Sequence, residues 1–154
     1  MKLSSPAFGH NKKIPKKYTC DAEGISPPLE IEDVPPNAKS LVLIMDDPDI
    51  PQFAKDKFNV GVWDHWVMFN LPPSLKLIKE HEIPKGITGK NTRGDLKYGG
   101  PCPPDKEHRY FFKLYALDCM LDLPEGATKS EVEDAMKEYI LEKTELIGLY
   151  EREK

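Results

Sequence analysis

The chain has 154 residues, of which 39% are hydrophobic and 31% charged, and it carries 22 basic against 26 acidic side chains for a net charge of −4. These values are typical of one soluble globular domain over residues 1–154, and they exclude a disordered chain. The acidic balance argues against a nucleic-acid binder, whose domain normally carries a basic face. No apolar run is long enough for a transmembrane segment, and the first residues lack the apolar stretch of a secretory signal, so we expect a cytoplasmic location.

Fifteen prolines restrict the fold, because proline is confined to strand edges, loops and first helical turns. The segments between the prolines favour a mainly β fold. The continuous apolar run KSLVLIMDD is typical of a strand that is buried on both faces. In chain order, the predicted strands cover residues 29–34, 39–47, 64–72, 109–118 and 145–152.

One helix is predicted near the C-terminus. Thr128 followed by Glu131 matches a capping box, which marks a helix start. We expect the apolar face of this helix to pack on a sheet, which gives a β-sandwich with one helix in the C-terminal region. The apolar residues that recur at the spacing of one helix face are Val132, Ala135, Met136, Tyr139 and Ile140.

Four short segments place polar groups at the ends of predicted strands. Because side chains alternate along a strand, His108 and Tyr110 share a face, and so do Asp47 and Asp49. The four segments are DDPDIP (46–51), WDHW (63–66), YGGPCPP (98–104) and HRY (108–110).

The same alternation in the strand at 64–72 places His65 on one face with Val67 and Phe69. Asp64 and Trp66 fall on the other face, together with Met68 and Asn70. If the strands are neighbours, the two histidines, the tyrosine and the aspartates converge on one small pocket.

The residue types of this pocket suit a small oxyanion. Imidazole N–H and tyrosine O–H groups are hydrogen-bond donors, and Gly99 and Gly100 would let backbone amides approach a ligand. A carboxylate beside a histidine favours the imidazolium, which helps to bind an anion. A carboxylate at the rim could also meet an ammonium group, so a zwitterion such as phosphorylethanolamine would use both signs of charge.

The ordered set DDPDIP, WDHWVMFNLP, YGGPCPP and HRYFFKLYAL closely resembles the phosphatidylethanolamine-binding protein family, also called Raf kinase inhibitor-like proteins. TCDAEGISPPLE (19–30) resembles the opening of its bacterial and archaeal branch. The resemblance implies a β-sandwich with short peripheral helices, a non-catalytic anion pocket and a cis bond at Ile50–Pro51. By position, it implies a ligand site formed by Asp47, Asp49, Trp63, His65, Gly100, Pro101, Pro103, His108 and Tyr110.

The three cysteines, Cys20, Cys102 and Cys119, are an odd number without CxxC spacing, so we expect neither a disulfide framework nor a zinc site. Cys102 lies six residues before His108, and a Cys–His nucleophile is therefore conceivable. The preferred interpretation is a small packed residue in a proline-rich loop.

Three neighbours of the motif residues are interpreted as structural. Trp66 is assigned to the core, whereas Trp63 is assigned to the pocket. Arg109 points away from His108 and is expected to pair with a carboxylate. Asp46 lies on the opposite face from Asp47 and is interpreted as a turn cap.

The sequence therefore predicts a non-catalytic module that binds a small phosphate-bearing ligand or a phospholipid headgroup, without a cofactor or metal. Two alternatives stay open: a protein inhibitor of serine proteases or kinases that acts through surface loops, and a metal- or cysteine-dependent hydrolase. The ligand, the protein partner and the oligomeric state are not specified, and a homodimer is compatible with the sequence.

Overall fold

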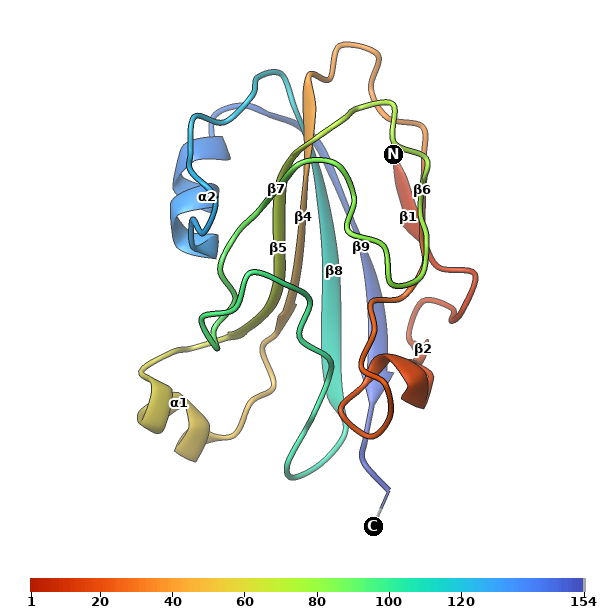
Figure 1. Ribbon diagram of the computed structural model, residues 1–154, viewed down its shortest axis with the longest axis vertical. Coiled ribbons are helices and arrows are strands. Elements are labelled where there is room, and N and C mark those ends of the chain that lie inside the picture. The colour runs from red at the N-terminus through yellow and green to blue at the C-terminus, as the bar shows by residue number, and fades with distance from the viewer. Residues whose placement is uncertain (154) are drawn as a thin grey trace.

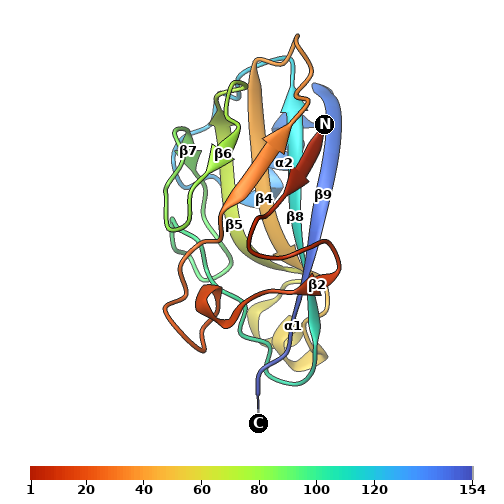
Figure 2. The same ribbon diagram turned by 90° about the vertical axis from the view of Figure 1, so that its right-hand side faces the viewer.

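Two β-sheets of unequal size face each other in the computed structural model, which describes residues 1–153 (Figure 1). The larger sheet has the strand order β2-β9-β8-β4-β5-β7, and the smaller sheet has the order β1-β3-β6. Figure 2 shows the small sheet over one face of the large sheet and helix α2 behind the other face. The mainly β sandwich expected from the sequence is confirmed.

The long strands of the large sheet are β4 (Ser40–Asp47), β5 (Trp63–Leu71), β8 (His108–Leu117) and β9 (Ile140–Tyr150). The helices are α1 (Gln52–Phe58) and α2 (Lys129–Met136), with a 3-10 turn at Lys16–Tyr18. The remaining strands are β1 (Lys2–Ser4), β2 (Lys12–Lys13), β3 (Leu29–Glu32), β6 (Leu77–Ile78) and β7 (Ile87–Thr88).

Strand β4 lies at the centre of the molecule and is buried along its whole length. Its side chains contribute to two hydrophobic cores, because successive side chains point to opposite faces of the sheet. Leu41, Leu43 and Met45 pack between the two sheets, whereas Val42 and Ile44 pack in the core under α2. The apolar run therefore predicted the most buried strand of the fold.

The predicted capping box starts α2: the Thr128 hydroxyl accepts from the Glu131 amide, and the Glu131 side chain accepts from the Thr128 amide. The predicted extension of the helix through Tyr139 and Ile140 is wrong. Helix α2 ends at Met136, and Ile140 begins β9 opposite Leu117 of β8. Pairing with β8 overrides the local helical spacing, and β9 therefore starts five residues before the predicted strand at 145.

Helix α1 follows β4 and precedes β5 in the chain, and lies at the lower left of Figure 1, beyond the ends of these two strands. Pro51 caps its N-terminus, and Asn59 ends it in the left-handed conformation (φ 53°). The Ile50–Pro51 bond, implied to be cis, is trans, as are the other peptide bonds of residues 1–153. Neither helix of these residues has the length and apolar character needed to cross a membrane.

Candidate functional site

A cavity of about 430 Å³ opens where β4 ends and β5 and β8 begin, between helix α1 and the proline-rich loop at 98–104. The structure places seven of the nine predicted ligand residues along its wall. Asp49 and Pro101 are not among the lining residues, and their role in ligand binding stays a prediction. The seven lining residues are Asp47, Trp63, His65, Gly100, Pro103, His108 and Tyr110.

A β-bulge brings His65 to the cavity. The register of β5 against β4 runs from Met45–Trp66 to Asp46–Asp64, so His65 is an extra residue without a partner. Its ring lies 5.3 Å from the Tyr110 ring, whereas Val67 packs in the core on the α2 side. Strict alternation, which placed His65 with Val67, is therefore wrong at this point of the strand.

The bulge also moves Asp64 away from the face of Trp66. Asp64 reaches Lys129, the first residue of α2, whereas Trp66 packs between the sheets. Trp66 belongs to the core, as predicted, and Trp63 lines the cavity. The local irregularity thus sorts these side chains into different environments.

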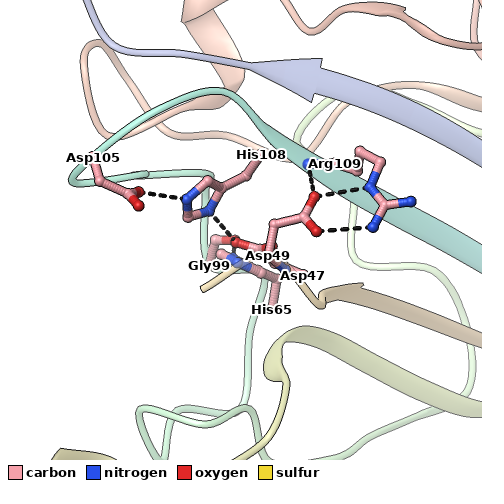
Figure 3. A network of polar contacts seen from close by, with 7 residues as sticks. All are labelled: Asp47, Asp49, His65, Gly99, Asp105, His108 and Arg109. Atoms are coloured by element: carbon pink, nitrogen blue, oxygen red, sulfur yellow. Dashed lines mark hydrogen bonds and ion pairs between the residues drawn. The ribbon is translucent and has the colours of Figure 1, made fainter. Parts of the chain in front are cut away.

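His108 lies between two carboxylates (Figure 3). Its Nδ1 is 2.7 Å from Asp47 Oδ2, and its Nε2 is 2.7 Å from Asp105 Oδ1. Burial raises the pKa of Asp47, and the bond from His108 opposes that rise. Both nitrogens of His108 are thus already paired within the protein.

Asp49 is held by Arg109 in a two-pronged ion pair on the outer side of β8, which Figure 3 shows beside the histidine. The Arg109 backbone amide donates to the same carboxylate at 2.9 Å. These bonds from Arg109 hold the pKa of Asp49 below its ordinary value. The expectation that Arg109 is structural and paired with a carboxylate is confirmed, and its partner is Asp49.

Two buried side-chain atoms among residues 1–153 lack a hydrogen-bond partner, namely the Tyr110 hydroxyl and Asp64 Oδ1. Lys129 Nζ lies 2.8 Å from Asp64 Oδ1, and this ion pair compensates the carboxylate. The Tyr110 hydroxyl has no such compensation, although its side chain is buried and lines the cavity. Burial raises its pKa, so the group stays a neutral O–H donor.

His65 has the opposite hydrogen-bonding character. Its Nδ1 is 2.8 Å from the Gly99 carbonyl oxygen, which only accepts, so Nδ1 carries the proton. Burial lowers the pKa of His65 to about 4, and the ring is neutral near pH 7. Its Nε2 is therefore a lone-pair acceptor, and that atom makes no hydrogen bond within residues 1–153.

The loop at 98–104 forms a wall of the cavity, and contacts with residues 18–19 hold it in place. Tyr98 donates its hydroxyl hydrogen to the Tyr18 carbonyl at 2.8 Å. A Cβ on Gly100 would come within 2.8 Å of the same carbonyl oxygen, so only glycine fits there. Gly100 thus serves close packing against the chain at 18–19, and the Gly99 amide donates to the His65 carbonyl.

A disulfide joins Cys20 to Cys102 across this wall, with the two Cα atoms 5.4 Å apart. The cysteine count and spacing did not suggest this bridge, and the interpretation of Cys102 as a nucleophilic thiol is wrong. The bonded residues are 82 positions apart, a pairing that spacing in the sequence does not reveal. Only Cys119 is free among the cysteines. The cytoplasmic location stays a prediction. The disulfide does not favour it, because disulfides are commoner in oxidising compartments.

One flank of the cavity is apolar. Helix α1 contributes Phe53 and Phe58, which are 62% and 47% exposed, and the Phe58 ring meets the Trp63 ring edge-on at 4.8 Å. Arg93 lies at the polar rim, is exposed and makes no ion pair within residues 1–153. The cavity therefore combines a polar floor, a cation at the rim and an aromatic flank.

A second ionic cluster lies on the other face of the same strand end. Asp46 is 2% exposed and accepts from Lys113 at 2.9 Å and from Lys129 at 3.2 Å. Burial alone would lower the pKa of Lys129, but Asp64 and Asp46 raise it above its ordinary value. Asp46 is thus the centre of an ion-pair network and not a turn cap. Sequence reasoning missed Lys113 and Lys129, which carry no motif.

Comparison with known proteins places this geometry in a family. The family model described as phosphatidylethanolamine-binding protein matches residues 4–151. The chain belongs to the phosphatidylethanolamine-binding protein family. The UPF0098 protein of Methanothermobacter thermautotrophicus is 49% identical over 158 residues, covering 99% of both chains. The UPF0098 protein of Chlamydia trachomatis is 46% identical over 153 residues and covers 99% of this chain and 100% of its own.

Solved structures of family members agree with the fold. The crystal structure of a phosphatidylethanolamine-binding protein homologue from Chlamydia trachomatis superposes with a TM-score of 0.93 at 46% identity, covering 98% of this chain and 97% of that one. Escherichia coli YbcL, described as a member of the mammalian family, gives a TM-score of 0.87 at 24% identity, covering 99% and 98%. The likeness to YbcL concerns the fold alone.

The lining of the cavity offers little for covalent or metal chemistry. It contains no serine, threonine or lysine, and both of its cysteines are in the disulfide. No group of three or more His, Cys, Asp or Glu side chains among residues 1–153 is arranged to hold a metal ion. The lining side-chain groups that make no hydrogen bond or ion pair within residues 1–153 include the Tyr110 hydroxyl, His65 Nε2, the Trp63 indole N–H and the Arg93 guanidinium.

Proposed function

We propose that the cavity binds a small phosphate-bearing anion, free or as the headgroup of a larger molecule, and that the protein is a binding or regulatory module without catalytic turnover. The observation that carries this proposal is the buried Tyr110 hydroxyl, a donor without an acceptor at the cavity. Leaving such a group unpaired costs about 1–3 kcal/mol, which an acceptor on a ligand would offset. A phosphate oxygen is a strong acceptor of this kind.

Charge and shape support the same proposal. Arg93 supplies a cation at the rim of the cavity. The cavity of about 430 Å³ has room for an organic group beside the phosphate, and Phe53 and Phe58 offer that group an aromatic surface. The family description, phosphatidylethanolamine-binding protein, agrees with a ligand that carries a phosphate on an organic body.

The test is a calorimetric titration of inorganic phosphate and phosphorylethanolamine in metal-free buffer. We expect saturable binding by the wild type and its loss in His65→Ala/His108→Ala. The matched control is His10→Asn/His81→Asn, which removes two exposed histidines outside the cavity and should bind as the wild type does. A folded wild type that binds neither compound would overturn the proposal.

Inhibition of a protein partner is a second candidate. Phe53 and Phe58 are large, exposed aromatic side chains of α1 that both line the cavity, and exposed apolar side chains mark many interaction sites. A serine protease or a kinase could be contacted through this surface. Inhibition that survives His65→Ala/His108→Ala but is lost in Phe53→Ser/Phe58→Ser would favour this candidate.

A further inference from the structure

The floor of the cavity carries one donor and one acceptor side by side. The Tyr110 hydroxyl is buried without an acceptor, and His65 Nε2 is an acceptor without a donor. The two rings lie 5.3 Å apart in an edge-on arrangement and both line the cavity. A ligand that satisfies both atoms must therefore accept one hydrogen bond and donate another within a small span.

A hydrogen bond fixes the proton on one ring nitrogen of His65, and burial favours the neutral ring with Nε2 as an acceptor. Nδ1 is committed to the Gly99 carbonyl, and the bulge in β5 holds the ring in a nearly closed position, 6% exposed. A second proton on the ring would place a charge in this buried site, and burial costs the charged form most. The lowered pKa of His65, caused mainly by burial, agrees with this geometry.

The charged neighbours of His65 do not reverse this state. Asp46 on β4 favours protonation of the ring, whereas His108 on β8 and Arg93 on the rim loop oppose it. Asp47 is paired with His108, and Asp64 is paired with Lys129. Tyr110, the remaining titratable group beside the ring, stays neutral.

Among phosphate compounds, only some offer a donor. A phosphate monoester has a second pKa near about 6, and its singly protonated form carries one P–OH donor beside acceptor oxygens. A phosphate diester and a sulfate monoester carry the same single negative charge but no such proton. The pair formed by Tyr110 and His65 therefore distinguishes ligands of equal charge by one hydrogen atom.

We propose that the cavity selects phosphate monoesters in their singly protonated form, with P–OH donating to His65 Nε2 and Tyr110 donating to a phosphoryl oxygen. This inference rests on the proposed function and names the ligand class of the same site. It assigns a free monoester as the ligand in preference to an intact phospholipid, whose phosphate is a diester.

Three matched ligands test the selection on the wild-type protein. Phenyl phosphate is a monoester, methyl phenyl phosphate is its diester, and phenyl sulfate is its sulfate counterpart, and none carries an ammonium group that could donate to His65. At about pH 5.5, where phenyl phosphate is mainly in its singly protonated form, we expect it to bind at least about tenfold more tightly than the other two, since each of these faces His65 Nε2 with an unprotonated oxygen or an alkyl group.

Proton uptake gives a second readout. At pH 7.5 free phenyl phosphate is mainly the dianion, so its binding should take up about one proton, measured by calorimetry in buffers of different ionisation enthalpy. The apparent affinity should fall about tenfold from pH 7 to pH 8, as the fraction of monoanion does. Proton uptake that goes to His65 instead would let phenyl sulfate bind as tightly as phenyl phosphate.

The variant His65→Gln replaces the acceptor by an amide that can also donate. We expect it to bind phenyl sulfate at least as tightly as phenyl phosphate and to lose the proton uptake, while Tyr110→Phe weakens all three ligands. If the glutamine variant does not fold, the three ligands on the wild type decide alone.

Each outcome bears on the inference. Equal affinity of the wild type for the three ligands, or binding of phenyl phosphate without proton uptake, would overturn the selection but leave the proposed anion site intact. Absence of any binding by the folded wild type would overturn both.

Discussion

Asp46 and Asp47 are consecutive residues at the end of β4, are equally buried at 2% exposure, and point to opposite faces of the large sheet. On the α2 side, Asp46 is matched by two lysines, one of which also pairs with Asp64. On the cavity side, Asp47 is matched by His108 and by the Asp49 amide. Both carboxylates are satisfied, but their surroundings differ.

The difference lies in what is left over. The α2 side contains only ion pairs between groups of the protein and is covered by a helix, which is the pattern of a structural network. The cavity side leaves the Tyr110 hydroxyl and His65 Nε2 without partners in a hollow with an aromatic flank. Both faces contain buried charge. The candidate site differs from the ion-pair network because it has hydrogen-bonding groups without partners in a cavity.

The largest expected effect comes from the disulfide, which reinforces the cavity side alone. Cys20→Ser/Cys102→Ser should lower the free energy of unfolding by about 4 kcal/mol, because the bridge closes a loop of many residues in the unfolded chain. Urea unfolding of the two proteins under non-reducing conditions measures this difference. Cys119→Ser is the matched control, since Cys119 is free, and should change stability little. Equal midpoints for the double variant and the wild type would show that the bridge is not formed in solution.

The next effect is an acid sensitivity on the cavity side. The pKa of His65 is about 4 in the folded protein against 6.5 ordinarily, so between these values the unfolded chain binds more protons and stability falls as pH falls. The loss from pH 7 to pH 4 attributable to His65 is about 3 kcal/mol. Urea unfolding at the two pH values should show that His65→Gln lacks this part of the loss and that His81→Asn retains it. An identical acid loss in His65→Gln would contradict the buried neutral imidazole.

Sequence reasoning reached the strands of the site but not the details that define it. The apolar run that ends in Asp46 predicted β4, and the spacing of His108 and Tyr110 placed both on one face of β8, because these signals are local. The bulge at His65 depends on the pairing of β5 with β4, which strict alternation does not contain. The histidines and the tyrosine do meet at one cavity, as predicted, but the strand face predicted for His65 was wrong.

Long-range pairings were out of reach for the same reason. Lys129 meets Asp46 from 83 positions away, and Cys102 meets Cys20 from 82 positions away, so neither contact leaves a pattern along the chain. The positional resemblance predicts Asp49 and Pro101 as ligand residues; in the structure neither is in the cavity lining, and Asp49 pairs with Arg109. Local patterns gave the elements, and contacts between elements decided which side chains face the cavity.

The third prediction concerns the ion-pair network of Asp46 on the α2 side of the sheet. Asp46→Asn removes the common partner of Lys113 and Lys129 and should lower the free energy of unfolding by about 2 kcal/mol, less than for a fully buried pair because both lysines reach solvent. Phosphate affinity should stay within about twofold of the wild type, since the network does not contact the ligand groups. Urea unfolding and calorimetry measure the two quantities. Intact stability together with lost phosphate binding would reverse the roles assigned to the two faces.

The smallest effect has the most informative sign. Tyr110→Phe removes a buried hydroxyl that has no partner, so the unliganded protein should gain about 1 kcal/mol of stability while phosphate binding weakens about tenfold. The control is Tyr150→Phe: this tyrosine is also buried, but its hydroxyl donates to Asp21 at 2.6 Å, and its loss should destabilise by about 1 kcal/mol. Thermal unfolding and calorimetry of both variants without ligand and with phosphate measure the contrast. A stability loss in Tyr110→Phe without ligand would show that the hydroxyl is already satisfied in the free protein, and the cavity side would then be as self-contained as the ion-pair network behind it.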